Sequence, residues 1–294
     1  MNRALFGLAV AVALAPPPAL AQELTGTLKK IKDGSAVAIG YRESSLPFSY
    51  LNAGGRPIGY SIDLCLEIVD DAKDVLGIDE VKVDYVPVTP ENRIDMVASG
   101  KVDLECGSTT SNLERQKRVA FSPVIFVSGT KLMVRRPVTI RSYLDLKGKT
   151  VAVTAGTTNQ KAMQILSDKR KLGMRFEVAK DHAQSFSLLE KGGVDAFATD
   201  DVLLYGLIAK SGRAKDFQVV GDFLSYEPYG IMYRKGDPEF DAVVKGAFER
   251  LATSRELEQN YNKWFLRKLP DGERLNLPMS AQLRSIFEIL GLPQ

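Results

Sequence analysis

The sequence predicts an α/β fold with two similar lobes, each built on a mainly parallel sheet flanked by helices. Two observations predict it. Segments with the apolar pattern of strands are followed by segments with the 3.6-residue period of helices, and this order occurs in two successive blocks. Two apolar, β-prone stretches, residues 125–134 and 228–233, join the blocks. We therefore expect two hinge crossovers, by which the chain passes from one lobe to the other and returns.

The first block supplies the start of lobe 1. Continuous apolar residues predict a buried strand over 35–40, and Ile62, Cys65, Val69 and Ala72 lie on one face of a helix that Gly59 opens. Alternation predicts a strand over 81–85, and Gly100 ends a short helix over 92–99. A strand over 102–105 and a helical turn over 112–117 complete the block.

The second block repeats the pattern and supplies lobe 2. The strands are expected at residues 150–154, 176–179, 194–199 and 218–220, and the helices at residues 159–169, 183–191 and 202–209. Asp181 is a candidate N-cap for the second of these helices, which stops at Gly192-Gly193. Three helices at 240–252, 256–265 and 281–290 then complete lobe 1. The predicted division is 22–128 plus 229–294 for lobe 1 and 129–228 for lobe 2.

Composition excludes several classes of protein. With 45% hydrophobic and 26% charged residues among 294, the chain is globular, and each of two domains can bury a core of its own. A net charge of +3 without any Lys/Arg run does not indicate nucleic-acid binding. One histidine and two cysteines exclude zinc sites built from Cys and His clusters, and no cofactor is predicted.

Residues 1–21 have the pattern of a cleaved secretory signal peptide. Asn2-Arg3 supplies the positive start, an apolar run follows, and Ala19-Leu20-Ala21 places small residues where a signal peptidase cuts, before Gln22. The apolar run is only about a dozen residues long, too short to cross a bilayer. No later stretch approaches the length of a membrane span, so we expect an exported protein without membrane insertion.

Export changes the interpretation of Cys65 and Cys106, the only two cysteines. An oxidising compartment permits a disulfide between them, which would contribute about 4 kcal/mol by restricting the unfolded chain. The alternative is two buried thiols that pack as small apolar side chains. The sequence favours the disulfide slightly.

Polar side chains gather where the predicted strands end. Because parallel α/β sheets bind ligands at the carboxyl ends of their strands, two facing lobes would bring these groups around one cleft. The candidate ligand-binding residues are Arg42, Arg93, Ser108, Thr110 and Arg115 from the first block and Thr157, Thr158, His182 and Asp200 from the second. Asp201 is the less favoured member of its acidic pair.

These residue types predict a ligand with two negative groups and one positive group. An arginine fork holds a carboxylate bidentately, and the turn Gly156-Thr157-Thr158 at a helix N-terminus offers free N–H groups to an anion. A carboxylate such as Asp200 suits an ammonium. That charge pattern belongs to glutamate or aspartate. Taken singly, each residue has a commoner structural role, as a solvated arginine, an N-cap or a structural histidine.

Several motifs give the chain a resemblance to a known family. The run from Gly107 to Lys117 (GSTTSNLERQK), Arg42-Glu43-Ser44-Ser45 with Pro47-Phe48-Ser49-Tyr50, and Gly59-Tyr60-Ser61-Ile62-Asp63 resemble periplasmic polar amino-acid-binding proteins of ABC importers. Within that family (bacterial solute-binding protein family 3) the glutamate/aspartate branch is most similar, on Arg42, Asn92-Arg93-Ile94, Glu105-Cys106-Gly107 and Lys180-Asp181-His182. The resemblance covers almost the whole mature chain and implies the two-lobed periplasmic-binding-protein fold. One departure is Tyr41, where some relatives have His.

The resemblance also implies a role for each candidate. Arg115 would clamp the ligand α-carboxylate, to which the loop at Thr157 and Thr158 would offer backbone N–H groups. Ser108 and Thr110 would share the α-carboxylate and the α-ammonium. Asp200 would pair with the α-ammonium. Arg42, Arg93 and His182 would receive the side-chain carboxylate. The implied ligands are L-glutamate and L-aspartate, and the implied partner of a monomeric, periplasmic protein is the membrane permease of an ABC importer.

Three alternatives remain open from the sequence. A site for a neutral polar amino acid such as glutamine would keep the fold and Arg115. Some relatives of this fold are dehydratases of cyclic acids, although no nucleophile–base pair or metal set is visible here, so we expect no enzyme activity. The same fold also serves as a sensor module, which would require a separate membrane partner.

Overall fold

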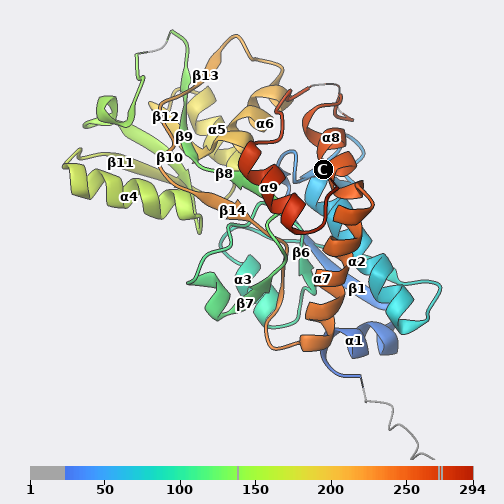
Figure 1. Cartoon of the computed structure of the whole chain (residues 1–294). Helices are drawn as coiled ribbons and strands as arrows, with labels where there is room; N and C mark the ends of the chain where they lie inside the picture. Colours follow the sequence, from blue (N-terminus) through green and yellow to red (C-terminus); the bar gives the residue numbers. More distant parts are fainter. Residues whose placement is uncertain (1–23, 138, 271, 273, 294) are drawn as a thin grey trace, which may run out of the picture.

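The computed structural model describes residues 24–137, 139–270, 272 and 274–293. The predicted signal peptide, 1–21, lies outside this range. The described chain forms two lobes, each with one five-stranded sheet (Figure 1). We call them lobe 1 and lobe 2 by these sheets. In the described part of the chain, no helix combines the length and apolar character that a membrane span needs.

The sheet of lobe 1 has the order β5-β1-β6-β15-β7. Its strands are β5 (Lys82–Pro87), β1 (Ala36–Tyr41), β6 (Leu104–Glu105), β15 (Met232–Arg234) and β7 (Val119–Phe121). The sheet of lobe 2 has the order β11-β10-β12-β9-β13. Its strands are β11 (Arg175–Ala179), β10 (Thr150–Thr154), β12 (Ala196–Asp200), β9 (Thr130–Arg135) and β13 (Phe217–Val220). The two lobes therefore repeat one arrangement.

Both sheets are mixed: in each, four strands run in one direction, as expected of a mainly parallel sheet, and one strand runs against them. The β1–β5, β1–β6, β10–β11 and β10–β12 pairs are parallel. The β15 and β9 strands, however, lie antiparallel to both of their neighbours. The physical reason is the crossovers: each of these strands follows one directly, so it enters its sheet without the intervening helix that a parallel connection needs.

Helices cover both faces of each sheet, and the alternation of strand side chains determines the cores. In lobe 2, Val151 and Val153 pack in one cluster with α4 (Thr158–Arg170), whereas Ala152 packs in another with α5 (His182–Glu190) and α6 (Asp201–Ser211). Successive strand side chains point to opposite faces, so one strand serves both clusters.

Lobe 1 has the same construction. Its larger cluster packs α1 (Gly26–Gly34), α2 (Tyr60–Leu76), α7 (Pro238–Thr253) and α8 (Glu256–Phe265) against one face of the sheet. The opposite face packs Val119 and Met232 with α3 (Arg93–Ala98). Short elements fill the connections: β2 (Ser44–Ser45), β3 (Ser49–Leu51), β4 (Pro57–Ile58), η1 (Arg115–Lys117) and η2 (Tyr143–Leu146).

Two crossover strands join the lobes. The strands β8 (Phe126–Ser128) and β14 (Glu227–Tyr229) pair antiparallel outside both main sheets, and we call this pair the hinge. The hinge falls within or next to the apolar stretches that predict it from sequence. The lobe boundaries at 128/129 and 228/229 stay a prediction.

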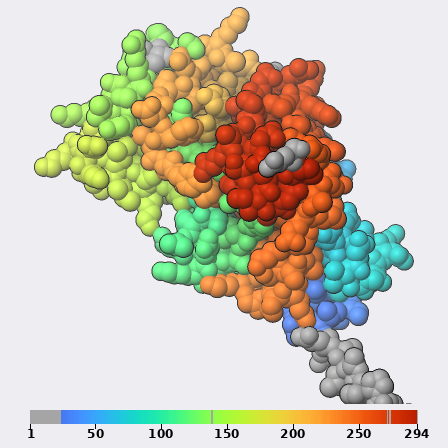
Figure 2. Space-filling view, in the orientation of Figure 1, coloured from blue at the N-terminus to red at the C-terminus, as the bar shows by residue number. Residues whose placement is uncertain are grey.

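The C-terminal helix lies over the hinge. The helix α9 (Ala281–Ile289) lies beside β8, and Gln282 Nε2 donates to the hydroxyl of Tyr226, 2.8 Å away and just before β14. Figure 2 shows this red segment on the same face as the orange segments that precede it. Leu283 and Phe287 anchor the helix in the core of lobe 1.

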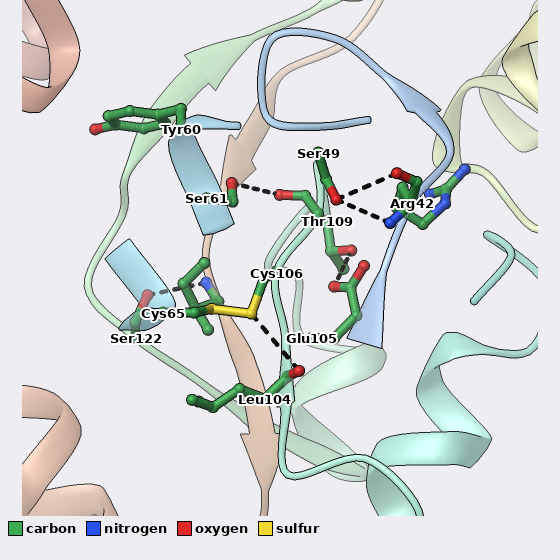
Figure 3. The surroundings of a disulfide bond; sticks show 12 residues. Arg42, Ser49, Tyr60, Ser61, Cys65, Leu104, Glu105, Cys106, Thr109 and Ser122 are labelled. Carbon is green, nitrogen blue, oxygen red and sulfur yellow. Dashed lines mark hydrogen bonds between the residues drawn. A yellow bond between two sulfur atoms is a disulfide. The ribbon is translucent and has the colours of Figure 1, made fainter. Parts of the chain in front are cut away.

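The two cysteines are bonded, as the sequence favours. Cys65 on α2 and Cys106 form a disulfide with a Cα–Cα distance of 6.2 Å. Figure 3 shows the bond between the helix and the segment that leaves β6.

Candidate functional site

The predicted site residues of both lobes meet between the lobes. Arg115 Nη2 of lobe 1 donates to the carbonyl oxygen of Gly156 in lobe 2, at 3.3 Å. Gly156 has φ of +72°, and a Cβ there would be 2.6 Å from Cα of Glu91 in lobe 1, so only glycine permits this approach. A pocket of about 400 Å³ opens here, lined by Arg115, Gly156 and Thr158 among others. We call this arrangement closed.

Arg42 and Arg93 are buried cations with few protein partners. Arg42 follows β1 and is 1% exposed, yet neither Nη1 nor Nη2 has a hydrogen-bond partner among the described residues. Arg93 opens α3; its Nη1 donates to the carbonyl oxygen of Ser108 at 3.4 Å, and its Nε has no partner there. Burial lowers the pKa of both groups, and Arg93 lowers that of Arg42 further. Both can still bind an anion.

His182 is buried beside the same two arginines. Its Nδ1 lies 3.1 Å from Thr154 Oγ1 at the end of β10. Burial, then Arg42 and Arg93, keep its pKa well below the ordinary value. The ring is therefore neutral near pH 7. Asp181 caps α5 by accepting from the N–H of Gln184 at 2.8 Å, as predicted.

Arg115 holds the loop that follows β6. Its Nη1 donates to the carbonyl oxygen of Thr110 at 2.8 Å, and burial lowers its pKa. A guanidinium has five donors, so Arg115 keeps three beyond its bonds to Thr110 and Gly156. Ser108 Oγ on the same loop is buried and without a partner in the described structure. The unpaired donors of both residues suit an anion.

The two threonines at the start of α4 have different roles. Thr157 is the N-cap, and its Oγ1 accepts from the N–H of Gln160 at 3.1 Å, as a structural cap does. Thr158 lies in the pocket, with its Oγ1 3.4 Å from Thr110 Oγ1 of the other lobe. The structure therefore brings Thr110 and Thr158 together.

Asp200 and Asp201 face different neighbours. Asp200 ends β12 and accepts from Asn159 Nδ2 at 2.7 Å and from the hydroxyl of Tyr229. Burial, then the charge of Glu227, raise its pKa to about 7. Asp201 accepts from Ser128 Oγ in the hinge at 2.7 Å. The cluster of candidate residues thus includes Asp200, while Asp201 is bonded to the hinge.

Two buried carboxylates in this cluster are absent from the predicted site. Glu227 on β14 accepts from the Oγ1 atoms of Thr110 and Thr158, each at 2.6 Å. Glu105 accepts from Thr109 Oγ1 at 2.6 Å. The charges of both glutamates raise the pKa of Arg93, against the effect of burial. One signal for Glu227 is present in the sequence: an acid stands directly before an apolar, β-prone stretch, and a buried acid needs hydrogen-bond partners.

The disulfide fixes the start of the loop that carries two of the predicted site residues. Cys106 stands directly before the loop that carries Ser108 and Thr110. Ser61 on α2 donates to the carbonyl oxygen of Gly107 at 2.8 Å, so the start of the loop is bound to the same helix twice (Figure 3). Among the described residues no group of His, Cys, Asp and Glu has the arrangement of a metal site.

The chain is similar in sequence and in structure to known proteins. The chain is 46% identical to the L-glutamate/L-aspartate-binding protein of Pseudomonas aeruginosa over 96% of this chain and 94% of that protein. It is 41% identical to the glutamate/aspartate import solute-binding protein of Salmonella typhimurium over 89% of this chain and 87% of that protein. A solved structure of a mutant of ArgBP from T. maritima matches with a TM-score of 0.72 and 27% identity, covering 82% of this chain and 99% of that one.

The family assignment rests on most of the chain. Residues 37–267 match one family from β1 through the end of α8, a range that includes both sheets, the hinge and every predicted site residue. The two-lobed fold and its family resemblance, expected from the motifs, are confirmed. The chain belongs to the bacterial extracellular solute-binding proteins, family 3.

Proposed function

We propose that this protein captures L-glutamate and L-aspartate between its two lobes and delivers them to an ABC importer in the membrane. One observation carries the proposal: Nη1 and Nη2 of Arg42 and Nε of Arg93 are buried donors without partners among the described residues, in addition to the donors of Arg115. A ligand with a single carboxylate would leave the donors of Arg42 and Arg93 unpaired. The names of the two relatives support the same ligands.

In this proposal each ligand group has its own partners. Arg115, Ser108 and the N–H groups at the start of α4 hold the α-carboxylate, and Asp200 with Thr110 holds the α-ammonium. Arg42, Arg93 and the neutral His182 receive the side-chain carboxylate. Donation from Thr154 to Nδ1 of His182 would leave its Nε2–H to donate to that carboxylate. All these pairings are strengthened by burial.

A signal peptide cleaved before Gln22 would export a monomer to the periplasm, and the lobes would divide at 128/129 and 228/229. Binding rather than catalysis is proposed because the relatives are named as binding proteins. The match to an extracellular solute-binding family supports a location outside the cytoplasm.

Titration calorimetry on the mature protein, unfolded and refolded to remove bound ligand, tests the proposal. The panel is L-glutamate, L-aspartate, L-glutamine and L-histidine. We expect tight binding of the two acidic ligands and weak binding of glutamine, because glutamine leaves Arg42 and Arg93 without a carboxylate. Tight glutamine binding would remove the assigned roles of Arg42, Arg93 and His182. Absence of heat with every amino acid would overturn the proposal as a whole.

A further inference from the structure

Glu227 receives hydrogen bonds from both lobes at one oxygen atom. Thr110 Oγ1, from the loop after β6 in lobe 1, and Thr158 Oγ1, from the first residue of α4 in lobe 2, both donate to Oε2 at 2.6 Å. Ser225 Oγ donates to Oε1 at 2.6 Å. Glu227 is 2% exposed and belongs to the hinge strand β14.

This position differs from that of an ordinary buried acid. Ser225 is two residues away and can satisfy Oε1 whatever the lobes do, but the two threonines come from elements that the hinge separates. When the lobes move apart, Oε2 loses at least one of its two donors. The carboxylate is buried in the closed arrangement, so a lost bond leaves a desolvated charge poorly satisfied unless water replaces it.

The carboxylate also determines how the two hydroxyls point. A carboxylate accepts only, so each threonine must direct its proton at Glu227. The lone pairs of Thr110 Oγ1 and Thr158 Oγ1, which are 3.4 Å apart, then point elsewhere and can accept from a cation. Asn159, the next residue of α4, donates to Asp200, so the carboxylates of Glu227 and Asp200 are held by neighbouring residues.

We propose that Glu227 is a positioning residue for ligand capture, which joins Thr110 and Thr158 across the hinge only in the closed arrangement and turns both hydroxyls to accept the ligand ammonium. This inference rests on the proposed function. It adds a residue that the charge pattern of the cleft does not require, because Asp200 already supplies a carboxylate for the ammonium. The role of Glu227 is to hold the two hydroxyls and, through them, the two lobes.

The test replaces Glu227 by glutamine and measures L-glutamate binding by calorimetry, with the dissociation rate by stopped flow. An amide oxygen accepts more weakly than a carboxylate, so we expect Kd to rise about 10- to 100-fold, mostly through faster dissociation. The ligand-free protein should melt cooperatively within a few degrees of the unchanged protein. The matched control is Asp222→Asn, which removes an exposed acid from the same connection and should leave Kd unchanged.

A double-mutant cycle with Thr158→Val shows whether Glu227 acts through the hydroxyl. Thr158→Val alone should weaken binding about 3- to 10-fold, and the double variant should bind no more weakly than Glu227→Gln alone. If Glu227→Gln does not fold, Thr158→Val and Thr110→Val carry the test, since both leave the acid in place. Either one binding like the unchanged protein would then overturn the inference.

Failure of the inference is distinct from failure of the proposed function. If the unchanged protein binds no acidic amino acid, the proposed function fails. If it binds L-glutamate and Glu227→Gln binds equally tightly, the inference alone fails. Additive effects of Glu227→Gln and Thr158→Val would also overturn it, because Glu227 would then act without the hydroxyl. Small-angle X-ray scattering adds a readout: Glu227→Gln should need more ligand to reach the compact form.

Discussion

Gly206 on α6 of lobe 2 lies against the carbonyl oxygen of Leu46 in lobe 1. A Cβ on Gly206 would stand 2.3 Å from that oxygen, closer than any real contact. The neighbouring residues Val202 and Leu203 pack in the core cluster of lobe 1. The start and middle of α6 therefore form an interface between the lobes in the closed arrangement.

Gly206→Ala should separate closure from folding. Alanine is better than glycine inside a helix by about 1 kcal/mol, so the ligand-free protein should melt at an equal or higher temperature. In the closed form the methyl group meets backbone, at a cost of about 1–3 kcal/mol, so Kd for L-glutamate should rise about 5- to 150-fold. Calorimetry and thermal melting check both effects.

The control for this substitution is Gly246→Ala on α7. Nothing lies within 4 Å of a Cβ at Gly246, so the helix gains the same propensity without any clash. Its affinity should equal that of the unchanged protein. If Gly206→Ala binds as tightly as Gly246→Ala, the contact with Leu46 does not govern closure.

Arg42→Ala should weaken acidic ligands far more than it weakens the fold. Nη1 and Nη2 have no hydrogen-bond partner among the described residues, so the loss of these two groups breaks no hydrogen bond there. A bound side-chain carboxylate, in contrast, would be left buried and unpaired, at about 3–5 kcal/mol or roughly 100- to 5,000-fold in Kd. Calorimetry with L-glutamate and L-glutamine, beside urea unfolding without ligand, measures the difference. Equal losses for both ligands would contradict the assigned role.

Binding of L-glutamate should release a proton near pH 7. The pKa of Asp200 is raised from 3.8 to about 7 by burial and by Glu227, so the carboxyl is largely protonated at pH 6. An ammonium beside it favours the charged form. Kd should therefore be about tenfold weaker at pH 6 than at pH 8, the limit for one proton with this pKa.

The sign for stability is opposite to the usual one for an acid. Because the folded pKa of Asp200 lies above its unfolded value, the free energy of unfolding without ligand should fall as pH rises from about 4 to about 7. Tyr229, Asn159, Glu227 and Asp201 all act on the pKa of Asp200, and its charge in turn acts on Arg93 and Arg115. Calorimetry of L-glutamate binding at each pH, in two buffers of different ionisation enthalpy, counts the protons released on binding. His182→Gln, measured in parallel, removes any proton taken up by the histidine, and no proton release in either protein would reject the role of Asp200.

Reduction of the Cys65–Cys106 bond should destabilise the fold. The bond closes a separation of 41 residues, for which chain entropy gives about 4 kcal/mol. Urea unfolding with and without a reductant checks the value, and the double variant Cys65→Ala/Cys106→Ala should be insensitive to reductant. L-glutamate binding should also weaken, because the loop of Ser108 and Thr110 begins at Cys106. Equal unfolding curves in both conditions would refute the prediction.

Local patterns predicted most of the helices and strands of this fold. The apolar period placed α2, α4, α5, α6, α7 and α8 close to their observed bounds, because each helix packs one apolar face against a sheet. The helix α1 and the short strands β2–β4 were not predicted. The antiparallel strands β9 and β15 were also missed in direction, since pairing direction depends on the path of the chain between lobes.

Site residues could be predicted where the residue type itself indicates the ligand group, as arginine indicates an anion. Arg42 stands directly after β1, and Arg93 and Arg115 lie in the segments that follow β5 and β6. The fold brings these strand ends together, so position and charge agree. Whether each bonds a ligand is the prediction that the binding experiments test. Glu227 was not predicted as a site residue because its partners, Thr110 and Thr158, are 117 and 69 residues away in sequence. Only the tertiary structure brings them together.

The unpaired Nη1 and Nη2 donors of Arg42 affect how well the closed form of the protein reports that a ligand is bound. Shutting the lobes around Arg42 has a desolvation cost that the charges of Glu105 and Asp181 offset only in part, because Nη1 and Nη2 have no hydrogen-bond partner among the described residues. A ligand carboxylate would reduce that cost. We therefore expect the closed form to be less populated without ligand than with it. A membrane protein that recognises the closed form would then respond mainly to the loaded protein, so the guanidinium proposed to bind the amino acid would also suppress signals from the empty protein.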